Sequence, residues 1–202
     1  MIEQRRTRGK VDRGVRDRLV DAARTCVREH GVAATSSRRI TTAAAENLAS
    51  ITYYFGSKDE LIAVALAEEL REWIEPARAL LARTDDPVAR LLEAVTELST
   101  AFDAERARVP ALLEAFVGAA RDPAARGPVA AIWCEVRSQL TDVLVELQAR
   151  ELVPRWVDAE AMAALVIAVV AGTVVNETVD PDGPSHTRVA AQFATLLVSS
   201  PR

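Results

Sequence analysis

The chain has 202 residues, of which half are apolar and 27% are charged, and its net charge is −4. A chain of this length can bury a sizeable core without metals or disulfides, and its sparse glycine favours helices. Two histidines and two cysteines without a CxxC pair exclude a metal-ligand cluster of conventional spacing, so neither a metal nor another cofactor is expected.

The N-terminus is charged and has no apolar segment, so no signal peptide is expected. The longest apolar run, residues 161–175, is shorter than the roughly 20 residues that span a bilayer. We therefore expect a cytoplasmic protein without a membrane segment, in which Cys26 and Cys134 are buried free thiols.

Charge is distributed unevenly along the chain. Residues 1–60 hold 12 Lys/Arg and 8 Asp/Glu, whereas residues 61–202 hold 13 and 21. Seven basic side chains fall in the first eighteen residues: Arg5, Arg6, Arg8, Lys10, Arg13, Arg16 and Arg18. This asymmetry indicates a basic head that meets a polyanion, although a solubilising tail gives the same pattern.

The apolar spacing predicts a first helix that starts near residues 13–16 and ends at His30-Gly31. Short helices follow from Ser37 to about Ala45 and from Leu48 to Tyr54, capped by the Thr35–Ser37 segment and by Asn47. Ser57 begins a longer helix with a capping box, which Pro76 bends or interrupts.

Later helices are separated by five breaks, at residues 84–87, 109–110, 121–128, 154–158 and 180–185. The first of these breaks provides Asp86 as a cap, with a proline directly after it. Together these patterns predict an all-α fold of about nine helices.

Three consecutive aromatic residues stand in the third predicted helix. At 100° per residue, Leu48, Ile51 and Phe55 fall on one side, while Tyr53 and Tyr54 fall on the other beside small polar residues. A short helix that packs by three apolar residues and displays hydroxyl groups is typical of the second helix of a helix-turn-helix, which enters the major groove of DNA.

The stretch "ARTCVREHGVAATSSRRITTAAAENLASITYYFGSKDEL", residues 22–61, resembles the tetracycline-repressor (TetR) family of bacterial regulators. Gly31 with Thr35-Ser36, Ile40, Tyr54-Phe55 and Ser57-Lys58 carry the resemblance. It departs from the family at Ala45, where glycine is usual, and a positive φ there would cost about 1 kcal/mol.

The resemblance implies a flexible basic arm at residues 1–14, a three-helix DNA-binding domain at 15–60 and a ligand-binding and dimerisation domain at 61–202. It implies that Ser36, Ser37 and Arg38 begin the helix that crosses the DNA backbone. It further implies base contacts by Asn47, Ser50 and Tyr53 and phosphate contacts by Thr52, Tyr54 and Lys58. Plain helix capping by the serines, a solvated Lys58 and a packing role for Tyr53 are the alternatives.

The apolar helix at 158–179 must be covered on every side, and small residues would let a second helix approach it. We expect a homodimer interface formed by this helix and the next one, through Ala164, Ala168, Ala171, Gly172, Val189, Phe193 and Leu196; a monomeric core is the alternative. Large side chains of separate helices could line a ligand pocket, with polar groups nearby: Trp73, Phe102, Phe116, Trp133 and Met162, with Arg137, Glu114 and Asn176. A plain core role is the alternative for each of them.

The sequence therefore predicts a ligand-responsive repressor that binds a palindromic operator in double-stranded DNA and is released by a small hydrophobic molecule. A regulator without a ligand, or one controlled by a protein partner, has the same sequence features. An enzyme is not expected, because His30 and His186 have no neighbouring nucleophile motif.

Overall fold

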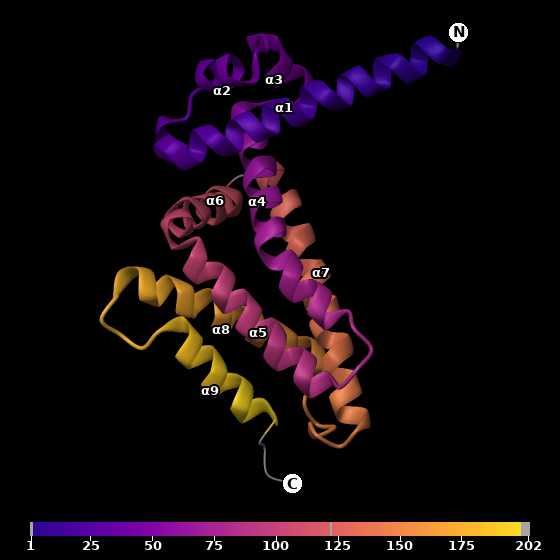
Figure 1. The fold of residues 1–202 in the computed structure, drawn as a ribbon, viewed down its shortest axis with the longest axis vertical. Coiled ribbons are helices and arrows are strands. Elements are labelled where there is room, and N and C mark those ends of the chain that lie inside the picture. Colours follow the sequence, from indigo (N-terminus) through magenta and orange to yellow (C-terminus); the bar gives the residue numbers. More distant parts are fainter. Residues whose placement is uncertain (1, 122, 199–202) are drawn as a thin grey trace. The chain divides into compact units, whose positions relative to one another are not determined.

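The computed structural model describes the backbone of residues 2–121 and 123–198, and the side chains of residues 14–196 apart from 108, 115, 122, 124, 125 and 194. Within this part of the chain there are nine α-helices, a short 3-10 helix and no strand, so the expected all-α fold is confirmed (Figure 1). The chain divides into an N-terminal unit, Met1–Leu70 with Ala111–Ala130, and a C-terminal unit, Arg71–Pro110 with Ala131–Arg202.

The N-terminal unit contains helices α1 (Ile2–Ala34), α2 (Ser37–Ala44) and α3 (Leu48–Phe55) and the first part of α4 (Lys58–Leu81). Figure 1 shows α2 and α3 as two short helices beside α1. Their apolar faces enclose one core, whose largest fully buried members are Leu19, Val20, Val27, Ile40 and Leu61.

The first helix starts earlier than the sequence predicted, at Ile2 rather than near residues 13–16. The side chains of residues 1–13, which include most of the expected basic arm at 1–14, lie outside the described residues, so the arm stays a prediction. The predicted stop at Gly31 is confirmed, since Gly31 interrupts the helical backbone with φ 76° and ψ 167°.

Each predicted N-terminal cap of the short helices is confirmed. The Ser36 hydroxyl accepts the Arg39 N–H at 3.2 Å, and the Asn47 side-chain oxygen accepts the Ser50 N–H at 3.0 Å. The Ser57 hydroxyl accepts the Glu60 N–H at 3.1 Å at the start of α4, which then continues through Pro76 to Leu81. These bonds satisfy backbone donors that a helix leaves unpaired at its first turn.

The turn between α2 and α3 depends on a left-handed alanine. Ala45 has φ 55° and ψ 40°, its N–H binds the Thr42 carbonyl, and the Glu46 N–H binds the Thr41 carbonyl at 2.9 Å. These two backbone hydrogen bonds form a Schellman motif, in which glycine is the favoured residue at the left-handed position that Ala45 occupies here. The Ala45 side chain therefore imposes the backbone strain that a positive φ costs a residue other than glycine. Glu46, the next residue, forms an ion pair with Arg18 of α1.

The C-terminal unit contains α5 (Pro87–Ala104), the 3-10 helix η1 (Arg106–Arg108), most of α7 (Pro123–Ala149), α8 (Ala159–Val179) and α9 (His186–Val198). Helix α6 (Val109–Arg121) lies almost wholly in the N-terminal unit. The predicted break over 121–128 is wrong in extent, because α7 already begins at Pro123 and includes Pro128. Asp86 and Asp158 cap α5 and α8 through the Ala89 and Ala161 N–H groups.

A buried arginine fastens the end of α4 to α5 and α7. Arg90 of α5 is 3% exposed, and its guanidinium donates to the Leu81 and Arg83 carbonyls and pairs with Glu146 of α7. Its Nε is the one buried side-chain nitrogen or oxygen without a hydrogen-bond partner among the described side chains, although it lies 4.0 Å from the Asp85 carboxylate. The apolar core beneath these helices includes Leu91, Val143, Leu144 and Leu147, and Cys134, expected to be buried, is exposed.

By length and composition, helix α8 is long and apolar enough to cross a membrane. Its longest apolar run, residues 161–175, is shorter than the roughly 20 residues that span a bilayer. An apolar helix of a soluble core passes the same test, so this property is weak evidence for a membrane segment. Ala163, Val166, Thr173 and Val174 of α8 are buried within the unit, and Asp158 caps its first turn.

We expect Ala45→Gly to stabilise the protein by about 1 kcal/mol, because glycine removes the steric cost of a left-handed backbone. Urea unfolding measures the change in free energy. The matched control is Ala43→Gly, an exposed position inside α2, where glycine should destabilise by about 0.5–1 kcal/mol. An Ala45→Gly protein no more stable than the parent would show that the turn is unstrained.

Candidate functional site

Helix α3 presents one face to solvent and the other to the core. Ile51 and Phe55 are buried as predicted, and Tyr53 is 75% exposed. Two predictions for this helix are wrong: Leu48, expected to pack inward, is 51% exposed, and Tyr54, expected to face out, is half-buried against the core. The Tyr53 ring meets Tyr54 edge-to-face at 4.8 Å, so Tyr54 braces the exposed ring.

The outward face of α3 offers both polar and apolar groups. The Ser50 hydroxyl donates to the Asn47 side-chain oxygen at 3.3 Å, which leaves the serine lone pairs and the Asn47 amide nitrogen available as acceptors and donors. Thr52 and Tyr53 are exposed beside them. An exposed leucine at the start of the same helix suits contact with a thymine methyl group, and the helical wheel missed it.

The start of α4 lies beside the start of α2. Lys58 donates to the Thr35 carbonyl at 3.4 Å and lies 3.3 Å from Asp59, while a third of its side chain remains exposed. The structure therefore brings Lys58 next to Ser36 and Ser37, with Arg38 exposed on the same short helix. A helix N-terminus with a lysine and an arginine nearby is suited to a phosphate group.

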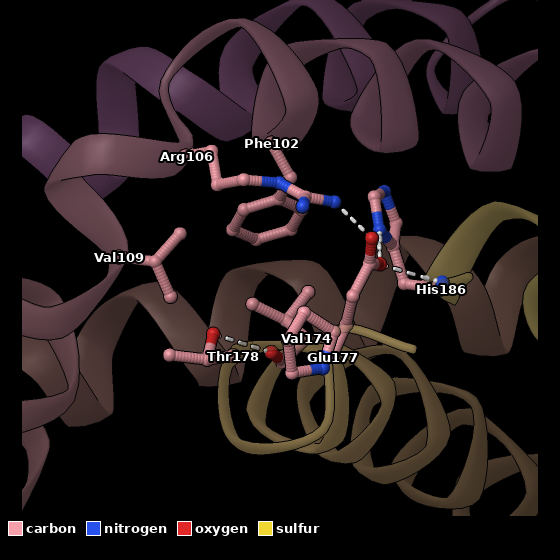
Figure 2. A pocket seen from close by; sticks show the side chains of 8 residues that line it. Phe102, Arg106, Val109, Val174, Glu177, Thr178 and His186 are labelled. Carbon is pink, nitrogen blue, oxygen red and sulfur yellow. Dashed lines mark hydrogen bonds and ion pairs between the residues drawn. The ribbon is translucent and has the colours of Figure 1, made fainter. Parts of the chain in front are cut away.

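A pocket of about 210 Å³ lies within the C-terminal unit (Figure 2). It has apolar walls and a charged end, and its lining residues are Phe102, Arg106, Val109, Val174, Glu177, Thr178, Pro181 and His186. They come from α5, η1, α6, α8, the α8–α9 loop and α9.

Glu177 and His186 form the polar end of this pocket. The Glu177 carboxylate accepts the His186 backbone N–H at 2.8 Å and contacts the His186 ring, and Arg106 pairs with its other oxygen. The second ring nitrogen of His186 faces the Ser99 carbonyl of α5 at 3.1 Å. Both ring nitrogens are thus engaged by oxygen atoms of the unit.

The environment of Glu177 favours its ionised form. The backbone N–H of His186 and then its ring, followed by the charges of His186 and Arg106, outweigh burial and lower the pKa of Glu177 to about 2. The carboxylate is only 10% exposed, so it is a nearly buried negative charge at physiological pH.

The residues that could hold a metal ion in the described part of the chain are Asp103, Glu177 and His186, whose ligand atoms lie within 4.8 Å of one another. Arg106 already pairs with both carboxylates. Both nitrogens of His186 are also engaged, whereas a ligating histidine needs a free lone pair. This group is therefore better suited to hydrogen bonding than to a metal.

Of the eight residues predicted to line a pocket or to supply polar groups in it, Phe102 is the one among the lining residues of this pocket. Trp73 of α4 is buried and packs edge-to-face on Phe102 at 6.0 Å, and Phe102 in turn meets the His186 ring at 6.3 Å. Met162 packs against the core of the unit, and Arg137 pairs with Glu160.

The remaining predicted pocket residues are not among its lining residues. Trp133 is half-buried in the same unit, and Asn176 is exposed on α8. Phe116 and the exposed Glu114 belong to the N-terminal unit. Sequence reasoning missed Glu177, although an acidic residue near the end of an otherwise apolar helix is a signal that could have indicated it. It treated His186 only as a residue near a helix start.

Helices α8 and α9 pack against each other and leave apolar side chains exposed. Leu165 and Val179 of α8 are 47% and 79% exposed, and Leu196 of α9 is 59% exposed. Among the residues predicted to form an interface, Ala164 and Ala168 are exposed and Ala171, Gly172 and Val189 are half-buried, while Phe193 packs against the core. An apolar surface of this kind is typical of an association surface.

Two family models match the chain. Residues 19–65 match "Bacterial regulatory proteins, tetR family", and residues 87–200 match "BetI-type transcriptional repressor, C-terminal". Among curated proteins, the chain is 27% identical over 177 residues to the HTH-type nicotine-responsive transcriptional repressor HdnoR of Paenarthrobacter nicotinovorans, covering 87% of this chain and 89% of that protein.

Solved structures share the fold. A TetR transcription regulator from Haloarcula marismortui has a TM-score of 0.75 at 24% identity, covering 92% of this chain and 97% of that one. The multidrug binding protein EbrR, complexed with imidazole, has a TM-score of 0.67 at 26% identity, covering 92% and 90%.

We expect the Glu177 contacts to make the C-terminal unit sensitive to acid. Because the pKa of Glu177 is lowered to about 2, its stabilising contribution is present above the unfolded value of about 4.3 and is lost as pH falls towards 2. Glu177→Gln should be less stable at pH 7 but lose less stability over this window. Urea unfolding monitored at a series of pH values measures this, and parallel pH profiles for the two proteins would contradict it.

Proposed function

This chain belongs to the tetR family of bacterial transcriptional regulators, and from that premise we propose that it is a homodimeric repressor which releases its operator when a small molecule binds the C-terminal unit. The observation that supports DNA binding most directly is the exposed face of α3, where Tyr53 stands 75% exposed on a helix capped by Asn47. A core residue of this size would be buried, so the exposed ring favours a role in recognition.

In this proposal, different residues contact the base edges and the phosphate backbone of the operator. Asn47, Ser50 and Tyr53 read base edges, with Leu48 against a thymine methyl group. Thr52, Tyr54 and Lys58 hold phosphates, and the start of α2 at Ser36, Ser37 and Arg38 holds the adjacent backbone, as does the basic arm at 1–14. Two copies of α3 related by a twofold axis would read a near-palindromic site with half-sites about one helical turn apart.

The effector site in this proposal is the pocket at Phe102, Glu177 and His186. Helix α4 starts at Lys58 beside α2 and carries Trp73, whose ring packs on Phe102 of the pocket. A ligand that moves Phe102 would move the Trp73 end of this helix and so bias the position of its Lys58 end. A hundredfold loss of DNA affinity needs a preference of about 2.7 kcal/mol for the non-binding state.

Relatives support a small organic effector. HdnoR is nicotine-responsive, and EbrR is a multidrug binding protein with imidazole bound in its crystal. The pocket of this chain, with apolar walls and one buried carboxylate, is suited to a similar class of small molecule. A regulator controlled by a protein partner or without an effector would bind the operator equally well but would not release it on addition of any small molecule.

Selection of bound duplexes from a random DNA pool would yield the operator. On that operator, we expect Tyr53→Ala and Ser50→Ala to weaken binding by about 1–3 kcal/mol each, because each removes a base contact. Thr96→Ala, an exposed threonine of α5 in the C-terminal unit, is the control and should bind normally. Unchanged affinity of both α3 variants would show that this helix does not read the operator.

We expect Gly172→Glu to convert the dimer to a monomer, because an unpaired charge would be desolvated where two copies of α8 approach. A Cβ atom added at Gly172 meets no atom of another part of the chain within 4 Å, so we expect the substitution to leave the fold intact. Gly118→Glu of α6 meets nothing either and is the matched control. Light scattering measures the mass, and a dimeric Gly172→Glu protein would place the interface elsewhere.

A further inference from the structure

The pocket of the C-terminal unit holds a negative charge that is almost removed from water. The Glu177 carboxylate is 10% exposed and is reached by three donor groups, two of them from His186 and one from Arg106. Figure 2 shows the Arg106 guanidinium and the His186 ring pointing to this carboxylate from different directions. The two His186 contacts belong to the start of α9, so they are part of the helix packing.

The Arg106 contact is of a different kind, because this side chain is replaceable. Arg106 is 56% exposed, whereas its partner carboxylate is nearly buried. It stands on a helix of three residues, and it has a second carboxylate, Asp103, at 3.6 Å, which is itself 54% exposed. The guanidinium can therefore leave Glu177 at little cost and keep an ionic partner in water.

The rest of the pocket is apolar and small. Phe102, Val109, Val174 and Pro181 contribute carbon surface around the carboxylate. A volume of about 210 Å³ is below the roughly 300–1,000 Å³ of typical drug-sized sites, so the occupant is a molecule of about one ring. Such an occupant can place its ring against Phe102 and its polar group at Glu177.

We propose that the pocket binds a small aromatic or aliphatic amine in its protonated form, and that the ammonium group takes the place of the Arg106 guanidinium on Glu177. This inference rests on the proposed role of the pocket as the effector site. An ammonium group donates charge-assisted hydrogen bonds to a carboxylate as a guanidinium does, while its apolar part fills space that Arg106 leaves empty.

An anionic ligand fits these observations less well. It would have to lie beside Glu177, which keeps its charge down to a pH of about 2. The His186 ring has no free donor for it, because its nitrogens face Glu177 and the Ser99 carbonyl. Arg106 would be its remaining cation, so an anion would depend on Arg106, whereas an amine competes with it.

This opposite dependence on Arg106 gives the test. The three probes, which have similar shapes and different charges, are benzylamine, benzyl alcohol and benzoate. Each is titrated into the full-length protein without DNA at neutral pH. Binding is measured by calorimetry or by tryptophan fluorescence. The variants are Arg106→Ala and Glu177→Gln. Arg83→Ala is the control, because Arg83 also pairs with two carboxylates in the same unit but does not line the pocket.

We expect benzylamine to bind more tightly than benzyl alcohol, and Arg106→Ala to tighten benzylamine about two- to fivefold, because it removes a guanidinium that competes for Glu177. Glu177→Gln should weaken benzylamine by about tenfold or more, and Arg83→Ala should have no effect. Since Glu177→Gln also affects the start of α9, the gain in Arg106→Ala is the decisive result.

Benzylamine binding that Arg106→Ala leaves unchanged or weakens would overturn the inference, and so would either of two further results. One is a preference for benzoate that Arg106→Ala abolishes, which would make Arg106 the anchor of an anion. The other is equal or absent binding of the three probes to both the parent and Arg106→Ala. Operator binding is measured separately on the same proteins, so a protein that fails to bind any selected duplex contradicts the proposed function, whereas one that binds its operator but ignores benzylamine contradicts only this inference.

Discussion

The contact of Glu177 with His186 determines how three helices of the C-terminal unit meet. The carboxylate of α8 accepts the first N–H of α9, and the histidine ring reaches the Ser99 carbonyl of α5. A charge at this depth is stable only when it is paired and hydrogen-bonded, so the start of α9 has little freedom to move away. The pocket, its charged end and the aromatic contacts to Trp73 all depend on this arrangement.

In the function that we propose, the same atoms serve helix packing and contact the ligand. A molecule that changes the partners of Glu177 also changes the forces that hold α8 against α9, and these two helices carry the exposed apolar surface to which we assign dimerisation. Phe102 lies between His186 and Trp73, so a disturbance at the pocket also reaches α4. The proposed response therefore requires no separate signalling element, since packed helices can shift as rigid bodies.

The N-terminal unit is organised by local contacts instead. Its short helices begin at side-chain caps, and the turn between them accepts a left-handed alanine because buried Ile40, Ala44 and Ile51 hold both helices on the core. Glu151 after α7 has φ 61° and closes a similar motif through the Leu152 N–H and the Leu147 carbonyl. In both places, tertiary packing outweighs a local cost of about 1 kcal/mol.

Caps and core positions were predictable because they depend on residues within one helical turn. Asn47, Ser57 and Asp86 were identified as caps from the sequence alone. Ser36 was placed within the capping segment Thr35–Ser37, and Asp158 was placed only within a predicted break. The exposed Leu48 was missed because a helical wheel gives the direction of a side chain but not the extent of the core it faces. The start of α7 was missed because a proline in the first turn of a helix loses no hydrogen bond.

The sequence by itself determined the helices, their caps, the strained turn at Ala45 and the family, since these depend on short-range backbone chemistry and on one contiguous motif. Only the tertiary structure decided the pocket. Arg106 and Glu177 are 71 residues apart, and Ser99 and His186 are 87 apart. Such pairs meet because of how α5, α8 and α9 pack, and packing depends on the fit of whole helix surfaces, which helical periodicity alone does not specify.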